Sequence, residues 1–180
     1  GAWVVASGGT VQVPDVGEAV GADMGAAWEV IKGEANVGAA VVIADWRCDW
    51  IGLGLAEKLA RDGCHVRLAV SGVVPGEALQ DTVRDHWVGE LHKLGVEMIP
   101  YMRLYGADDN AVYFQHMISG EAEVFDNVET LVTSYATRGE RGLLDELSDS
   151  AGEVMAIGDC VSPRTVEEAV PAGLRSGSKL

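Results

Sequence analysis

The sequence is poor in basic residues. Its 13 Lys and Arg are outnumbered by 28 Asp and Glu, which gives a formal net charge of −15 over 180 residues. A surface that binds nucleic acid or an anionic membrane needs clustered Lys and Arg to meet the phosphates. No apolar run approaches the roughly 20 residues that span a bilayer. We therefore expect neither a nucleic-acid partner nor a membrane partner.

Cysteine is also scarce, and no catalytic or metal-binding pattern is found. The three cysteines, Cys48, Cys64 and Cys160, form no Cys-x-x-Cys pair, and no histidine stands at ligand spacing from them. An odd number of cysteines without a signal peptide indicates a reducing, cytoplasmic location. No serine lies in a Gly-x-Ser-x-Gly motif, which argues against an α/β-hydrolase. We assign no catalytic residue and no metal ligand.

The apolar pattern predicts an α/β fold. Residues 39–44 and 65–70 are continuous apolar runs typical of buried strands, and residues 51–61 between them have apolar side chains at helical spacing. Strand, helix and strand within about 32 residues make a βαβ unit, whose right-handed crossover makes the strands parallel. We predict a Rossmann-like parallel sheet with flanking helices.

Other segments complete this prediction. Residues 97–125 contain short alternating runs, which favour a small antiparallel β layer, and residues 130–133 form a return strand. Strands at 4–6 and 154–157 are predicted to meet, although they lie near opposite ends of the chain. Further helices are predicted over residues 24–32, 77–94, 141–147 and 165–176.

The order of these motifs resembles the C-terminal half of one flavoenzyme family, which includes trimethylamine dehydrogenase, histamine dehydrogenase and 2,4-dienoyl-CoA reductase. The stretch Ile157-Gly158-Asp159 through Pro163-Arg164, with its following helix, is the most specific match. Three further segments are similar to that family, namely Val4 to Gly8, Asn36 to Asp45, and Leu55 to Gly63. Members of the family carry an FMN and iron–sulfur barrel, followed by a dinucleotide-binding domain into which a second one is inserted.

The resemblance implies a domain organisation. Residues 1–35 and 134–180 would be a partial outer domain of the FAD/ADP-binding type, and residues 36–133 an inserted NAD(P)-binding-like Rossmann domain. The family's glycine-rich βαβ unit would precede Gly1, so we expect one portion of a flavin-dependent oxidoreductase that is not catalytically complete alone. FMN and the iron–sulfur cluster would lie outside this chain, and ADP/FAD or NAD(P)H would bind in the full-length protein. The implied partners are the remainder of the flavoenzyme and an electron-transfer protein. The incomplete outer domain should also expose apolar edge surface, which favours association with a second copy of the chain.

Three candidate cofactor-binding residues come from the outer-domain motifs. The resemblance implies that Gly8, Gly158 and Asp159 lie beside a dinucleotide, where a backbone N–H contacts phosphate and the carboxylate accepts hydrogen bonds from sugar hydroxyls. In the alternative interpretation, Gly158 only forms a turn and Asp159 caps the next helix.

The turn from Asp45 to Gly52 departs from the glycine-rich fingerprint that nucleotide-binding relatives carry there. Glycines permit a tight turn and close approach to a pyrophosphate, whereas this turn reads Asp-Trp-Arg-Cys-Asp-Trp-Ile before Gly52. It is either a remodelled nucleotide or partner site, or a vestigial turn packed by Trp46 and Trp50. The candidate contacts are Asp45, Arg47, Gly52 and Ser71. We expect no FAD or FMN in the isolated chain and NADPH affinity of only about millimolar.

Overall fold

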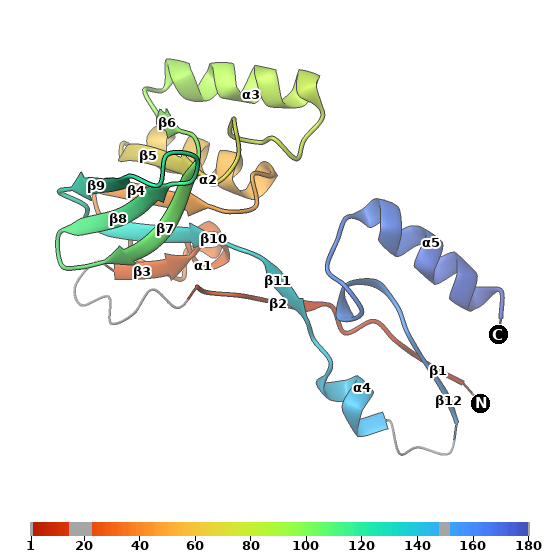
Figure 1. Cartoon of the computed structure of the whole chain (residues 1–180). Coiled ribbons are helices and arrows are strands. Elements are labelled where there is room, and N and C mark those ends of the chain that lie inside the picture. Colours follow the sequence, from red (N-terminus) through yellow and green to blue (C-terminus); the bar gives the residue numbers. More distant parts are fainter. Residues whose placement is uncertain (1, 15–22, 148–151, 180) are drawn as a thin grey trace. The chain divides into compact units, whose positions relative to one another are not determined.

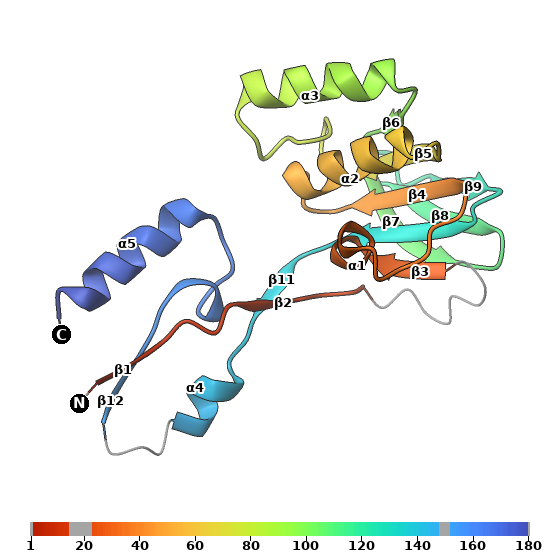
Figure 2. The same ribbon diagram turned by 180° about the vertical axis from the view of Figure 1, so that it is seen from behind.

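The computed structural model describes residues 2–14, 23–147 and 152–179, and the chain divides into two compact units (Figures 1 and 2). Unit 1 consists of Gly1–Gln12 and Ala136–Leu180, and unit 2 of Val13–Tyr135. The sequence placed the first boundary at residue 35, but residues 23–32 pair and pack with the sheet of unit 2. That the two units are FAD-type and NAD(P)-type domains stays a prediction.

Unit 2 is built on one parallel sheet of five strands in the order β3-β10-β4-β5-β6. The prediction that residues 40–44, 65–70 and 130–133 share a parallel sheet is confirmed. The last strand, β6, was expected in the antiparallel layer; it lies in the parallel sheet instead, because α3 makes a second crossover after β5. The strands are β3 (Asp23–Ala26), β4 (Ala40–Asp45), β5 (His65–Val70), β6 (Glu97–Ile99) and β10 (Thr130–Ser134).

Two different layers cover the faces of this sheet (Figures 1 and 2). Val41 and Ile43 of β4 pack toward the helices, whereas Val42 and Ala44 pack toward the antiparallel strands. Burial on both faces explains why β4 is apolar from Ala40 to Ala44 rather than alternating. The helices are α1 (Ala27–Lys32), α2 (Trp50–Arg61) and α3 (Asp81–Lys93), and the antiparallel strands are β7 (Met102–Ala107), β8 (Ala111–His116) and β9 (Ala122–Asp126).

Two helices begin three or four residues later than the sequence predicted. Residues 24–26 belong to β3, and α1 begins at Ala27, where the Glu29 carboxylate accepts the Ala26 N–H at 3.1 Å. The second, α3, begins at Asp81 instead of residue 77. The preceding N–H groups are used elsewhere, since Ala78 N–H donates to the Cys48 carbonyl at 3.0 Å. That bond ties the start of α3 to the turn after β4.

Unit 1 has much less regular structure. Its strands form two pairs, β1 (Ala2–Val5) parallel to β12 (Glu153–Ala156) and β2 (Gly9–Val11) antiparallel to β11 (Thr137–Gly139). The pairing of β1 with β12 confirms that the two ends of the chain meet. The helical elements are α4 (Gly142–Leu147), the 3-10 turn η1 (Gly158–Cys160) and α5 (Val166–Gly177). Within the described ranges, no helix has the length and apolar content to cross a membrane.

Candidate functional site

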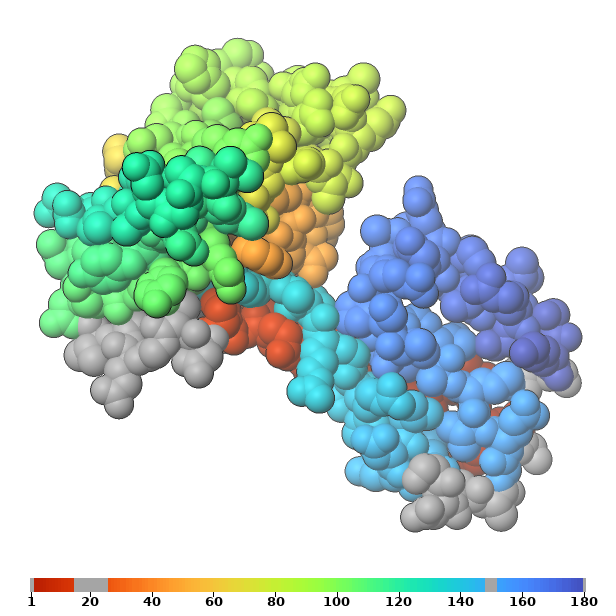
Figure 3. Space-filling model, in the orientation of Figure 1, coloured from red at the N-terminus to blue at the C-terminus, as the bar shows by residue number. Residues whose placement is uncertain are grey.

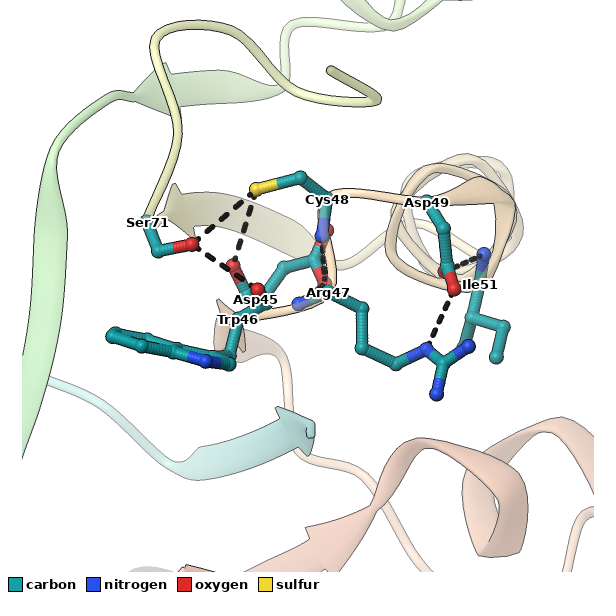
Figure 4. A network of polar contacts seen from close by, with 7 residues as sticks. All are labelled: Asp45, Trp46, Arg47, Cys48, Asp49, Ile51 and Ser71. Carbon is teal, nitrogen blue, oxygen red and sulfur yellow. Dashed lines mark hydrogen bonds and ion pairs between the residues drawn. The ribbon is translucent and has the colours of Figure 1, made fainter. Parts of the chain in front are cut away.

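The carboxyl ends of β4 and β5 form the candidate site of unit 2 (Figure 4). Parallel α/β sheets place their ligands at this edge, because the loops that follow the strands converge there. Ser71, after β5, donates its N–H to the Asp45 carbonyl at 3.1 Å. The four residues predicted for this site, Asp45, Arg47, Gly52 and Ser71, therefore lie together.

Asp45 is the buried centre of the turn, with a relative exposure of 1%. Its Oδ1 atom accepts the N–H groups of Arg47 at 3.1 Å and Cys48 at 3.2 Å. Its Oδ2 atom and the Ser134 hydroxyl of the neighbouring strand are both buried without a hydrogen bond of good geometry. Burial raises the pKa of Asp45 to about 6. The Ser134 side chain and the two N–H groups lower this pKa, whereas the negative charge of Asp49 raises it further.

Asp49 forms the start of α2. Its Oδ1 atom accepts the Ile51 N–H at 2.9 Å, which is the usual N-cap contact, and its Oδ2 atom accepts from Arg47 Nε at 2.6 Å. The Arg47 and Asp49 side chains are 29% and 13% exposed. Arg47 is thus already paired with a carboxylate of its own turn, and a bound phosphate would have to compete with Asp49 for it.

Cys48 connects the two strand ends. Its buried Sγ accepts the Gly72 N–H at 3.3 Å and lies 3.5 Å from the Ser71 Oγ, which also lies 3.1 Å from the Trp46 carbonyl oxygen. Burial raises the pKa of the Cys48 thiol, so it is neutral at pH 7. A neutral, buried thiol stabilises the turn but is not a nucleophile.

Glycines at this edge make room for carboxylates. A Cβ on Gly52 would overlap the Asp45 carboxyl group, and a Cβ on Gly72 would overlap the Glu77 carboxylate. Glu77 Oε2 accepts the Val73 N–H at 2.8 Å. Asp45 and Asp49 therefore accept N–H groups in the turn before α2, where an α/β sheet of this kind usually places a pyrophosphate, and Glu77 accepts an N–H group in the loop after β5.

Two tryptophans lie on the surface of this turn rather than inside it. Trp46 is 40% exposed and stacks on Tyr135, and Trp50 is 49% exposed and meets Trp28 edge-on. That the turn is vestigial stays a prediction; the two rings pack on its outer side. Polar contacts of Asp45, Cys48 and Asp49 hold its interior instead.

The other predicted residues, Gly8, Gly158 and Asp159, lie in unit 1. Gly8 and Gly158 follow β1 and β12 with positive φ of 81° and 67°, and nothing approaches the position of a Cβ on either. Asp159 Oδ1 accepts the Arg164 N–H at 3.4 Å. It does not cap α5, whose first turn is closed by Glu168 accepting the Thr165 N–H at 3.1 Å.

Beside the Gly158 turn lies a cavity of about 270 Å³. Three cationic side chains line it, namely Arg164, Arg175 and Lys179, together with the acidic Asp159 and Glu168. In the contacts described for the unit 2 turn, by contrast, Arg47 is accompanied by three carboxylates, those of Asp45, Asp49 and Glu77.

Sequence reasoning missed two residues that shape these turns. Glu77 comes six residues after Ser71 and was assigned to a helix. Gly139, at the end of β11, allows close approach to η1, because a Cβ there would overlap the Asp159 and Cys160 carbonyl groups. Neither position is marked by a spacing pattern. No group of three or more His, Cys, Asp or Glu side chains among the described residues is arranged to hold a metal ion.

The fold is shared with several oxidoreductases. Histamine dehydrogenase from Rhizobium sp. 4-9 matches 99% of this chain with a TM-score of 0.87 and 18% identity. The 6-hydroxypseudooxynicotine amine oxidase from Pseudomonas geniculata N1 matches 97% with a TM-score of 0.83 and 20% identity. The chain has the fold of a segment of these enzymes. The resemblance to the histamine dehydrogenase family is thus confirmed at the level of the fold.

Two further matches extend this comparison. N,N-dimethylglycine/sarcosine dehydrogenase from Chromohalobacter salexigens is 23% identical over 82% of this chain. The HOCl-induced flavoprotein disulfide reductase of Escherichia coli matches 98% of it, with a TM-score of 0.67 and 13% identity. The chain spans 26%, 30% and 28% of the sarcosine dehydrogenase, histamine dehydrogenase and amine oxidase chains. No protein-family model matches the sequence.

Proposed function

We propose that this chain is the dinucleotide-binding-type portion of a flavin-dependent oxidoreductase, and that unit 2 keeps the Rossmann layers without a working pyrophosphate site. One observation carries the second part: Asp45, Asp49 and Glu77 accept the N–H groups at the carboxyl edge of the sheet. A phosphate at this turn would have to displace these carboxylates from the N–H groups that they hold.

The electrostatics of the turn support the same conclusion. A phosphate brought to the start of α2 meets the Asp45 charge, which is present at pH 7, and the Asp49 carboxylate. Hydrogen bonds to charged groups contribute about 1.5–3 kcal/mol each, so displacing the carboxylates is costly. The closed turn favours a structural or electron-transfer docking role for unit 2.

Unit 1 is the better candidate for a nucleotide in the longer protein. Gly8 and Gly158 leave open space beside the ends of β1 and β12, and Arg164, Arg175 and Lys179 supply positive charge at the neighbouring cavity. These features fit the diphosphate of an ADP or FAD moiety, with Asp159 available to accept a sugar hydroxyl. When bound, the flavin would supply the redox chemistry, and the residues of this chain would bind and orient its nucleotide end.

Calorimetric titration with ADP, NADH and NADPH tests both parts. We expect constants no tighter than about millimolar for the isolated chain. Residual ADP affinity should fall in Arg164→Ala and stay unchanged in Arg47→Ala, which is the matched control in unit 2. A micromolar NADPH constant that is lost in Arg47→Ala would contradict the proposal, because it would make the β4–α2 turn a working nucleotide site.

A further inference from the structure

The outer surface of the antiparallel layer in unit 2 carries exposed aromatic and aliphatic side chains. The inner side chains of β7–β9, such as Leu104 and Phe114, are buried against the parallel sheet. On β8 and β9 the opposite side is formed by Tyr113, Gln115, Ala122 and Val124, since Tyr113 pairs with Val124 and Gln115 with Ala122. We call this surface, together with Tyr105 of β7, the tyrosine face.

The tyrosine face is open and hollowed. Tyr105 is 77% exposed, Val124 48% and Tyr113 36%. A groove of about 460 Å³ is lined by Tyr105, Tyr113, Gln115, Ala122 and Glu123, among others. The strands that carry it, coloured green to teal, are on the surface that faces the viewer in Figure 3. Exposed tyrosine rings beside a groove are typical of protein-binding surfaces, because they offer contact area at a low cost in side-chain entropy.

The charges around this face have one dominant sign. The segment from residue 102 to 126 contains five acidic residues, no lysine and a single arginine, Arg103, which pairs with Gln115. Arg67 of β5 adds one further cation at the edge, where it donates to the Asp126 carbonyl at 2.8 Å. Tyr113 donates a hydrogen bond to Asp108 at 2.5 Å, which fixes the ring and lowers the pKa of Asp108. The acidic residues are Asp108, Asp109, Glu121, Glu123 and Asp126.

We propose that the tyrosine face docks a protein partner whose contacting surface carries Lys or Arg residues around an apolar centre. The acidic rim attracts the basic residues, and cationic groups also bind the faces of exposed tyrosine rings. The same charges disfavour two other occupants. A second copy of this chain would bring a like-charged rim, and an anionic membrane would be repelled. The inference does not rest on the proposed function, since the face involves none of the residues of the nucleotide turns.

The test is an NMR titration of the 180-residue chain with a basic probe, the blocked peptide Lys-Leu-Lys-Leu-Lys. The matched probe replaces each Lys by Glu. We expect saturable shifts confined to β7–β9, including the Tyr105 and Tyr113 rings, and none with the acidic peptide. Tyr105→Ser should weaken binding by at least about tenfold, and Glu123→Gln by about threefold.

Val83→Ser is the control variant, because Val83 is a 47% exposed apolar residue on α3, away from the face. It should leave the binding constant unchanged. Shifts that spread evenly over α3 and α5, or that persist in both Tyr105→Ser and Glu123→Gln, would overturn the proposal. So would self-association in sedimentation that Tyr105→Ser abolishes, because the occupant would then be a second copy.

Discussion

The two units each contain a strand-to-helix turn, and the two turns differ in what occupies them. After β4, the turn of unit 2 is filled by the Asp45 and Asp49 carboxylates, which accept backbone N–H groups. After β12, the turn of unit 1 leaves Gly158 open beside a cavity with three cationic side chains. Both turns follow a parallel strand, but the first is closed by its own carboxylates and the second is open. Layers and strand order do not decide ligand binding; the side chains at the turn do.

The structure that supports the two turns differs as well. The β4 turn stands on a sheet covered on both faces, so its carboxylates are fixed by a rigid frame. The β12 turn stands on a pair of strands in which Trp3 is 55% exposed, and α5 exposes Val166, Val170 and Leu174. We infer that the closed turn is rigid and that the open turn is the more deformable of the two.

The largest expected effect comes from the buried charge of Asp45. Its folded pKa of about 6 lies above the ordinary value of 3.8, so ionisation favours the unfolded chain by about 3 kcal/mol at pH 7. This penalty disappears as the pH falls from 6 toward 4. Asp45→Asn should therefore be more stable than the wild type at pH 7, and the difference should vanish near pH 4. Denaturant unfolding at both pH values measures it, and a pH-independent difference would contradict the buried-charge assignment.

The second test concerns the space beside Asp45. Gly52→Ala should lower the free energy of unfolding by about 1–3 kcal/mol, because the new Cβ overlaps the Asp45 carboxyl group. Gly54→Ala, in the same helix, is the control; its Cβ would lie 3.5 Å from Trp87, so it should be neutral or stabilising by up to about 1 kcal/mol. Thermal unfolding of the pair separates packing from helix propensity. Equal changes in both variants would show that Asp45 does not occupy the turn.

The third test probes the open turn. Gly158→Ala should cost about 1–2 kcal/mol through its φ of 67° alone, since nothing lies within 4 Å of the new Cβ. Gly173→Ala in α5 meets equally open space without a positive φ and should not destabilise. Hydrogen exchange of the β1 and β12 amides reports the local effect in unit 1. If Gly173→Ala lost as much protection as Gly158→Ala, the backbone at Gly158 would not be the more strained of the two.

The smallest effect is expected for the ion pair in the β4 turn. Arg47→Ala removes the 2.6 Å contact with Asp49 but leaves the Asp49 cap of α2 in place, so a loss of about 0.5–1 kcal/mol is expected. Lys58→Ala breaks the more exposed pair with Asp62 and should cost about 0.3 kcal/mol. Chemical denaturation at low and high salt compares them. A loss above about 2 kcal/mol for Arg47→Ala would mean that the pair is a main support of the turn.

The sequence by itself determined the layers of unit 2 and the resemblance to the histamine dehydrogenase family. Continuous apolar runs at 40–44 and 65–70 with a helix between them leave few arrangements other than parallel strands buried on both faces. The pattern also identified the β4 turn as lacking the usual glycines. These features depend on residues that are close in the chain, so they can be recognised in a single sequence.

Only the tertiary structure decided what fills that turn and where two strands belong. Asp45 of β4 lies beside Ser134 of the neighbouring strand β10, Cys48 accepts the Gly72 N–H, and Gly139 approaches η1. No spacing rule connects these positions. The segments that form β3 and β6 are too short for periodicity to separate a strand from a helix or a parallel strand from an antiparallel one. Their assignment comes from backbone hydrogen bonds to β10 and β5, which lie far away in the chain.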